Sequence, residues 1–117
     1  MSNYIKTHLE NKNRIELHDA LQLSSAEVSI NTLPAGLCVP FIHAHKNNEE
    51  IYGIIAGKGT VIIDNETIEI TSGDWIKINP SAKRQFFAAK DSSITYICIQ
   101  AKENSLGDFT INDAVIY

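Results

Sequence analysis

Residues 36–57 read GLCVPFIHAHKNNEEIYGIIAG and place two histidines close to two adjacent glutamates. Successive side chains of an extended strand point to opposite faces, so His43 and His45 are predicted to project the same way. Two neutral imidazoles and one carboxylate suit a divalent first-row transition metal and leave coordination positions open for water or substrate. This stretch therefore predicts a metal site, or at least a liganded pocket.

The spacing of the stretch resembles the first signature of the cupin family, in which a glycine precedes His-x-His, a glutamate and a second glycine. Six residues lie between Gly36 and His43, one more than in the family pattern. Six residues also lie between Glu50 and Gly57, as the family has them. The resemblance implies that Glu50 is the ligand, and it leaves Glu49 on the opposite, solvated face of the strand.

Residues 73–85, which read GDWIKINPSAKRQ, resemble the second signature of the same family. Six residues separate Gly73 from Pro80, one more than the pattern, and Ala82 stands where the family has glycine. Gln85 occupies the position of the last histidine ligand, and its amide oxygen is a weaker donor than imidazole. The resemblance implies a site for Fe, Mn, Ni or Zn, with Fe(II) typical of two histidines and a carboxylate. Its ligands would be His43, His45, Glu50 and Gln85.

Short β-type runs separated by glycine- and proline-containing turns fill most of the chain and predict an all-β protein. The cupin resemblance implies a jelly-roll, or double-stranded β-helix, barrel. We expect one domain over residues 1–117, with the barrel core at about 26–101. A helical turn is expected at 19–23, a turn at 57–59 and an edge strand at 114–117. The expected strands are 26–33, 41–45, 50–56, 60–64, 67–71, 74–78, 85–89 and 94–101.

Composition narrows the class of protein. The 44% hydrophobic and 21% charged residues are ordinary for a globular domain, and the net charge of -4 argues against a nucleic-acid partner. No apolar run approaches a membrane span and the N-terminal residues lack the apolar core of a signal peptide, so we expect a cytoplasmic protein. Cys38 and Cys98 are then expected to be reduced and buried. The one adjacent basic pair, Lys83-Arg84, is either a solvated strand end or an attractor of anionic ligands to the barrel mouth.

Strand alternation sorts candidate pocket residues from wall residues. Tyr52 shares the face of Glu50, and Phe87 shares the face of Gln85, with Phe86 opposing it. Along the last long strand Tyr96 shares a face with a cysteine and a glutamine, and the sequence leaves open whether that face looks inward. The candidate substrate-binding residues are Tyr52, Phe87 and Tyr96.

Three functions fit these residues. The first is a metalloenzyme, namely an oxygenase, isomerase or lyase, that acts on a small carbonyl, enol or sugar-acid compound. The sequence shows no separate general base or nucleophile for it. The second is a non-catalytic small-molecule-binding protein that uses the same pocket. The third is a structural barrel with a vestigial metal site. Strands such as 51–55 are apolar on both faces, which predicts a homodimer through a sheet face and a terminal segment.

Overall fold

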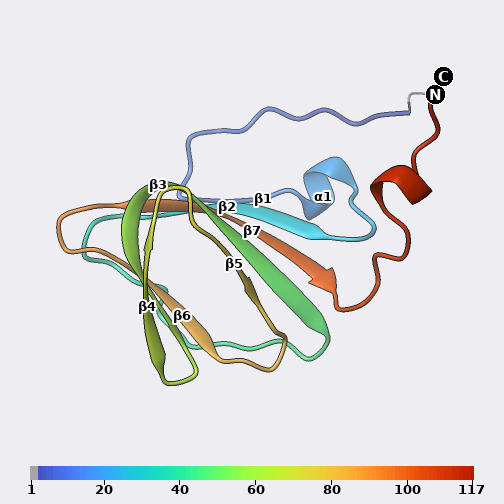
Figure 1. The fold of residues 1–117 in the computed structure, drawn as a ribbon. Coiled ribbons are helices and arrows are strands. Elements are labelled where there is room, and N and C mark those ends of the chain that lie inside the picture. The colour runs from blue at the N-terminus through green and yellow to red at the C-terminus, as the bar shows by residue number, and fades with distance from the viewer. Residues whose placement is uncertain (1–2) are drawn as a thin grey trace.

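The structure is a computed structural model and describes residues 3–117. Strands dominate, with one short α-helix near the N-terminus and one 3₁₀ helix near the C-terminus (Figure 1). Within the described residues, no helix has the length and apolar character needed to cross a membrane. The elements are β1 (Arg14–Glu16), α1 (His18–Leu21), β2 (Glu27–Leu33), β3 (Asn48–Ile63), β4 (Glu66–Thr71), β5 (Trp75–Ile78), β6 (Arg84–Ala88), β7 (Ile94–Lys102) and η1 (Thr110–Asn112).

The strands form two antiparallel layers that share β3. The first layer, called sheet A below, has the order β1-β2-β7-β3-β5 and uses the first part of β3. The second layer, sheet B, pairs the last part of β3 with β4 on one side and β6 on the other. The two layers face each other across a common interior (Figure 1). The predicted all-β barrel is confirmed.

Strand β3 is one element of 16 residues where the sequence predicted two strands and a turn at 57–59. The turn prediction was wrong because a bulge between Ile54 and Ala56 bends the strand without ending it. Gly57 has φ of +78°, and a Cβ atom there would lie 1.8 Å from the carbonyl oxygen of Ser93. Glycine at this position therefore lets β3 pass from sheet A to sheet B.

Two of the expected strands are absent, and one observed strand was not expected. Residues 41–45 form no strand, because their backbone pairs with its neighbours only at His43 and His45. The predicted edge strand at 114–117 is irregular, and the short strand β1 was not foreseen. The helical turn expected at 19–23 is present as α1.

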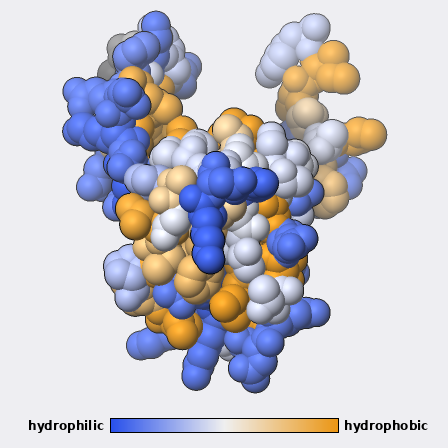
Figure 2. Space-filling view, turned by 90° about the vertical axis from the view of Figure 1, so that its left-hand side faces the viewer, coloured by the Kyte–Doolittle hydropathy of each residue, from blue (hydrophilic) through white to orange (hydrophobic). Residues whose placement is uncertain are grey.

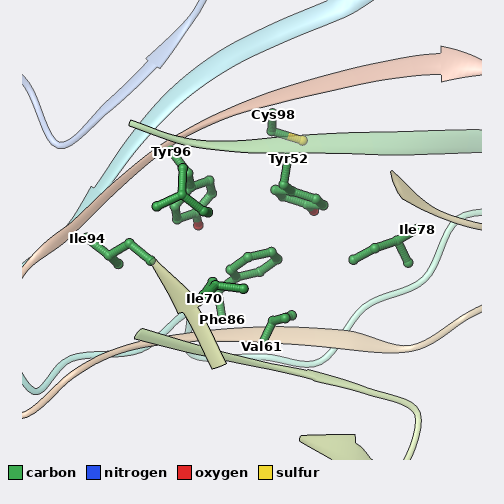
Figure 3. Packing of buried hydrophobic residues seen from close by; sticks show 9 residues of the cluster. Tyr52, Val61, Ile70, Ile78, Phe86, Ile94, Tyr96 and Cys98 are labelled. Atoms are coloured by element: carbon green, nitrogen blue, oxygen red, sulfur yellow. The ribbon is translucent and has the colours of Figure 1, made fainter. Parts of the chain in front are cut away.

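The core lies between the two sheets. Tyr52 of β3, Tyr96 of β7 and Phe86 of β6 form its aromatic centre, with the Phe86 ring 4.4 Å from Tyr52 and 4.9 Å from Tyr96 between centroids. Figure 3 shows Val61 and Ile70 of sheet B pointing toward the tyrosines of sheet A. Burying each such side chain contributes roughly 1.5–3 kcal/mol, so this cluster fixes the distance between the layers.

Candidate metal centre

The two histidines come from the loop between β2 and β3, which is held by backbone hydrogen bonds to the segment leading into β6. His43 exchanges hydrogen bonds with Arg84, at 3.2 and 2.9 Å, and the amide of His45 donates to the carbonyl of Pro80 at 2.8 Å. Their rings meet edge to face with centroids 5.1 Å apart. The loop therefore presents both imidazoles to the interior from a fixed backbone.

Glu50 enters the same space from β3, where β5 and β7 pair with it on either side. His43 Nε2 lies 3.4 Å from Glu50 Oε1, and His45 Nε2 lies 3.2 Å from Glu50 Oε2. One ligand atom from each of the three residues lies within 4.8 Å of the other two. The sequence-predicted grouping of two histidines and Glu50 is thus present in space.

Glu50 is only 4% exposed and is surrounded by donors. Tyr52 donates its hydroxyl to Oε1 at 2.5 Å, and the thiol of Cys98 donates to Oε2 at 3.3 Å. Arg84, with no exposed surface, donates from Nη1 to Oε1 at 3.0 Å and from Nη2 to the carbonyl of Asn79 at 2.7 Å. These contacts hold the carboxylate in one orientation.

Protonation of the cluster follows from burial and hydrogen bonding. Burial lowers the pKa of His43, although the charge of Glu50 opposes this. Burial alone would raise the pKa of Glu50, but the hydrogen bonds from Tyr52 and Cys98, with the charges of His45 and Arg84, hold that pKa below its ordinary value. A neutral imidazole beside an ionised carboxylate is the state that metal ligation requires.

The residues fit a metal by one further observation. His45 Nε2 is buried and, although it lies 3.2 Å from Glu50 Oε2, makes no hydrogen bond, and Nδ1 of His43 is likewise buried without a hydrogen-bond partner. Buried polar atoms are nearly always satisfied, so an orphaned imidazole nitrogen aimed at a carboxylate suits a cation between them. Two imidazoles and one carboxylate also match the donor set of divalent first-row metals.

The fourth expected ligand, Gln85, lines the same cavity as the cluster, but its side chain is engaged with another partner. Its side-chain amide donates to the carbonyl of Val39 at 2.8 Å, and Arg84 is the β6 residue whose side chain reaches Glu50. The expected facing of β6 was wrong by one residue, because Arg84 and Phe86 are the buried residues of this strand. The surplus residue between Gly73 and Pro80 was the available signal, since the family spacing counted from Gly73 reaches Arg84.

This shift also changes the candidate substrate-binding residues and the interpretation of Lys83-Arg84. Tyr52 and Tyr96 line the interior cavity, whereas Phe86 lines it in place of Phe87. Phe87 is partly exposed on the other face of β6, opposite Thr60 of β3. A solvated strand end describes Lys83 but not Arg84, which is fully buried because Glu50 and Asn79 accept its hydrogen bonds.

A cavity of about 180 Å³ adjoins the cluster. Tyr96 and Cys98 of β7 both line it, which resolves the face of this strand that the sequence left open. Burial is the main cause that raises the pKa of each of these two groups to about 12. Arg14 lines the cavity from β1 and has a largely exposed side chain, so the cavity reaches solvent near that residue. The two cysteines are free, with Cys98 buried as expected and Cys38 exposed.

Comparison with solved structures finds similar proteins at high and at low sequence identity. The crystal structure of a cupin protein from Bacteroides fragilis, BF4112, is 55% identical, with a TM-score of 0.97 over 100% of this chain and 99% of its own. The crystal structure of a sugar phosphate isomerase from a cupin superfamily, from Silicibacter pomeroyi, is 21% identical with a TM-score of 0.68, over 77% of this chain and 60% of its own, and shares the fold alone.

A curated relative and a family model complete the comparison. An uncharacterized protein of Methanocaldococcus jannaschii, MJ1618, is 33% identical over 57 residues, which are 49% of this chain and 46% of the relative. The chain thus matches about half the length of that relative. The family model of the cupin domain matches residues 30–100, which hold β2 to β7 and all three residues of the His-His-Glu cluster. This chain belongs to the cupin family.

Proposed function

We propose that the protein binds a divalent first-row transition metal inside the barrel through His43, His45 and Glu50, and binds a small organic ligand in the adjoining cavity. The observation that carries the proposal is the convergence of three ligand atoms within 4.8 Å around a buried, unpartnered imidazole nitrogen. Three protein ligands leave further coordination positions for water or ligand. Iron, manganese, nickel and zinc all suit this donor set.

When bound, such a metal supplies Lewis acidity or a dioxygen-binding centre to a carbonyl, enol or sugar-acid ligand. The protein contributes the orientation of the ligand set. Tyr52 and Arg84 both donate to Glu50 Oε1, and Cys98 donates to Oε2, which fixes the carboxylate against rotation. Such supporting hydrogen bonds commonly tune both metal affinity and ligand geometry.

The cavity supports a small, partly polar ligand. Tyr52, Phe86 and Tyr96 give it an aromatic wall, and Ser29 and Asn31 of β2 add polar groups. Flat carbonyl and enol compounds suit such a wall because aromatic faces pack well against planar groups. An enzymatic role would be that of a metal-dependent oxygenase, isomerase or lyase. A metal-bound protein without turnover would be a small-molecule binder.

A second candidate is supported by Arg84. Its guanidinium lies 3.0 Å from Glu50 Oε1 and has no exposed surface, so it already supplies a buried positive charge to this carboxylate. A built-in cation of this kind can take over the electrostatic role of a metal and lower the affinity for a divalent ion. On this alternative the barrel is metal-free, and its role is structural.

Metal analysis separates the two candidates. Protein purified without chelator and without an affinity-column metal should hold close to one transition-metal ion per chain on the metal-site proposal. Changing His43 and His45 together to alanine should lower the metal content at least tenfold while the β-type circular dichroism spectrum is kept. The matched control changes His8 and His18, two exposed histidines, to alanine and should keep the metal.

Each result has a definite meaning. Metal content unchanged in the His43 and His45 double variant would place the ion elsewhere and end the proposal. A wild-type protein that takes up none of iron, manganese, nickel or zinc in a competition titration would favour the metal-free barrel. Where metal is bound, a dioxygen-uptake and turnover screen across small enols, keto acids and sugar acids separates an enzyme from a binding protein.

A further inference from the structure

We propose that the end of the interior cavity next to β1 binds the carboxylate of a small organic acid through Arg14, Ser29, Asn31 and Tyr96, which together form the carboxylate site. This names a substrate class for the cavity, and it rests on the proposed function for the part of the ligand that reaches the metal. The carboxylate site is supported by the separation of charge along the cavity, a one-way chain of hydrogen bonds, and a buried hydroxyl without a partner.

The two ends of the cavity carry opposite charge. The pairing of sheet A places Glu27 and Glu50 in one row across β2, β7 and β3. Arg14, Asn31 and Tyr96 form a second row, four residues further along β2 and about 13 Å away between backbones. All five residues line the cavity. A ligand there therefore meets carboxylates at the metal end and a guanidinium at the other end.

Arg14 supplies the positive charge of the carboxylate site. Among the described residues, it is the one lysine or arginine that lines the cavity, and the exposed Glu16 that pairs with its Nε at 3.2 Å does not line it. Glu16 and Asn31 use two of the five guanidinium N–H donors, so the others remain for a ligand. A single cation in a cavity that also holds two carboxylates suits one negative charge, which favours a carboxylate over a phosphate dianion.

The hydrogen bonds around Asn31 run in one direction. Arg14 can only donate, so the atom of Asn31 that meets Nη1 must be the carbonyl oxygen Oδ1. Nδ2 of Asn31 then donates to Oγ of Ser29 at 3.0 Å. With its oxygen used as an acceptor, Ser29 keeps its own proton for another partner, and Asn31 keeps one N–H. Both side chains are buried and line the cavity, so these two donors are available to a ligand there.

The hydroxyl of Tyr96 is a further donor in the cavity. Tyr96 is 4% exposed, and its hydroxyl makes no hydrogen bond to any described residue, whereas the hydroxyl of Tyr52 donates to Glu50. Figure 3 shows the oxygen of Tyr96 directed into the space between the sheets. Burial raises the pKa of Tyr96 to about 12, and the charge of Arg14 opposes this rise. Arg14 therefore favours negative charge beside a hydroxyl that needs an acceptor.

An organic acid complements both ends of the cavity. An ionised carboxylate only accepts hydrogen bonds, which matches a site whose free groups are all donors. The aromatic rings of Phe86 and Tyr96 line the cavity and suit a flat carbon skeleton. The carbonyl or hydroxyl of the same ligand then faces His43, His45 and Glu50, where the proposed metal would bind it. The class is therefore a small keto, hydroxy or unsaturated acid, bound with its carboxylate away from the metal.

Titrations of the full chain with small acids and their amides test the carboxylate site. The acids are acetate, pyruvate, crotonate and benzoate, and inorganic phosphate is a further anion. Two-dimensional ¹H–¹⁵N NMR gives each dissociation constant from the backbone amides of residues 29–31 and 94–98, on protein as purified and after metal removal by a chelator. In both forms, at least one acid should bind about tenfold or more tightly than its amide and than phosphate.

Three variants show whether the preference comes from the named residues. Arg14→Met should weaken binding of that acid by about tenfold or more and leave the amide within about twofold. The matched control Lys12→Met removes the same charge from an exposed side chain that does not line the cavity, and should change neither affinity. Tyr96→Phe keeps the ring stacked on Phe86 and removes only the unpartnered hydroxyl, so it should fold even if Arg14→Met does not. It should weaken the acid by about threefold or more.

Acids that bind no more tightly than their amides would overturn the carboxylate site, as would acid binding that neither Arg14→Met nor Tyr96→Phe weakens. Phosphate that binds more tightly than every acid would overturn the choice of a carboxylate. Metal analysis of the same samples separates this result from the proposed function. A protein without metal that still prefers acids through Arg14 keeps the carboxylate site and loses the metal centre, whereas a metal-bound protein without that preference loses the carboxylate site alone.

Discussion

The two faces of sheet A differ in the side chains that they present: the inner face combines buried apolar residues with polar ones, and the outer face is largely apolar. The inner face carries polar and ionisable side chains, among them Ser29, Asn31, Glu50 and Cys98, whereas the outer face is rich in isoleucine. The inner polar groups are paired with one another: Asn31 donates to Ser29 at 3.0 Å, and Glu50 accepts from Cys98. Pairing removes most of the cost of burial, so the barrel can devote one interior wall to binding.

Alternate residues of the same strands therefore have two different roles. Along β3, Glu50 and Tyr52 serve the interior cluster, while Ile51 and Gly53 belong to the outer face. Val61 and Phe86 of the opposite layer complete the apolar core from the other side. The comparison predicts that equivalent substitutions on the two faces will have very different effects.

The largest expected effect concerns thiol reactivity. Cys98 faces the interior and is 8% exposed, whereas Cys38 lies exposed in the loop between β2 and β3. Burial and the adjacent Glu50 raise the pKa of Cys98 to about 12, so its reactive thiolate is scarce at neutral pH. In metal-free native protein at pH 8 we expect iodoacetamide to modify Cys38 at least about a thousandfold faster than Cys98.

The raised pKa of Cys98 also makes the stability of the native state depend on pH, with a defined sign. A thiol whose pKa is raised by folding stabilises the native state below its unfolded pKa of 9.0, and this contribution is lost as pH rises toward about 12. Mass spectrometry after timed labelling measures both rates, and Cys38→Ser isolates the slower one. Comparable rates for the two thiols at pH 8 would show that the interior of sheet A opens to reagent.

The next effect is the loss of the buried ion pair. Arg84→Met keeps the length of the side chain but leaves Glu50 buried without its fully buried cationic partner, which should lower the free energy of unfolding by about 3–5 kcal/mol in metal-free protein. Lys83→Met is the matched control on the exposed face of the same segment and should change it by less than about 0.5 kcal/mol. Urea denaturation measures both.

Adding saturating metal to the same urea denaturation tests whether the ion binds beside Glu50. With the guanidinium gone, a divalent ion meets less repulsion at Glu50, so saturating metal should stabilise Arg84→Met more than it stabilises the wild type. Equal stabilisation of the two proteins would mean that the ion does not bind near Glu50. A loss below about 1 kcal/mol in Arg84→Met without metal would mean that the ion pair is replaced by water or by the neighbouring histidines.

How much of this the sequence could reveal depends on whether the signal is local. His43, His45 and Glu50 were identified because strand alternation and motif spacing act over a few residues. Arg84 and Phe86 were missed because a single surplus residue before Pro80 moves the register by one, and a shift of one residue exchanges the two faces of a strand. The sequence offered two starting points for counting, Gly73 and Pro80, and no local criterion to choose between them.

The lack of a local signal also explains why a turn was predicted inside β3. Gly57 and Gly59 carry the local signature of a turn, yet both lie inside the strand, because a bulge and a neighbouring backbone decide their conformation. At Gly59 an added Cβ would lie 2.1 Å from the carbonyl oxygen of Phe87, which belongs to β6. Such a contact joins residues far apart in the sequence and becomes visible only when the sheets are assembled.

The smallest expected effect is at Gly53, on the outer face. An added Cβ there would lie 2.3 Å from the ring of Trp75, a side chain that is 62% exposed and can swing into solvent. Gly53→Ala should therefore lower the free energy of unfolding by only about 1 kcal/mol or less and shift the tryptophan emission to longer wavelength, because the ring loses its contact with the sheet.

Gly59→Ala meets backbone that cannot move aside, so it should lower the free energy of unfolding by more, about 1–3 kcal/mol. Since Trp75 is the single tryptophan, fluorescence during urea denaturation reports both quantities. Equal losses of stability at the two glycines would show that the outer face of sheet A is packed as tightly as the interior, which a covering second copy would explain and a solvent-exposed face would not.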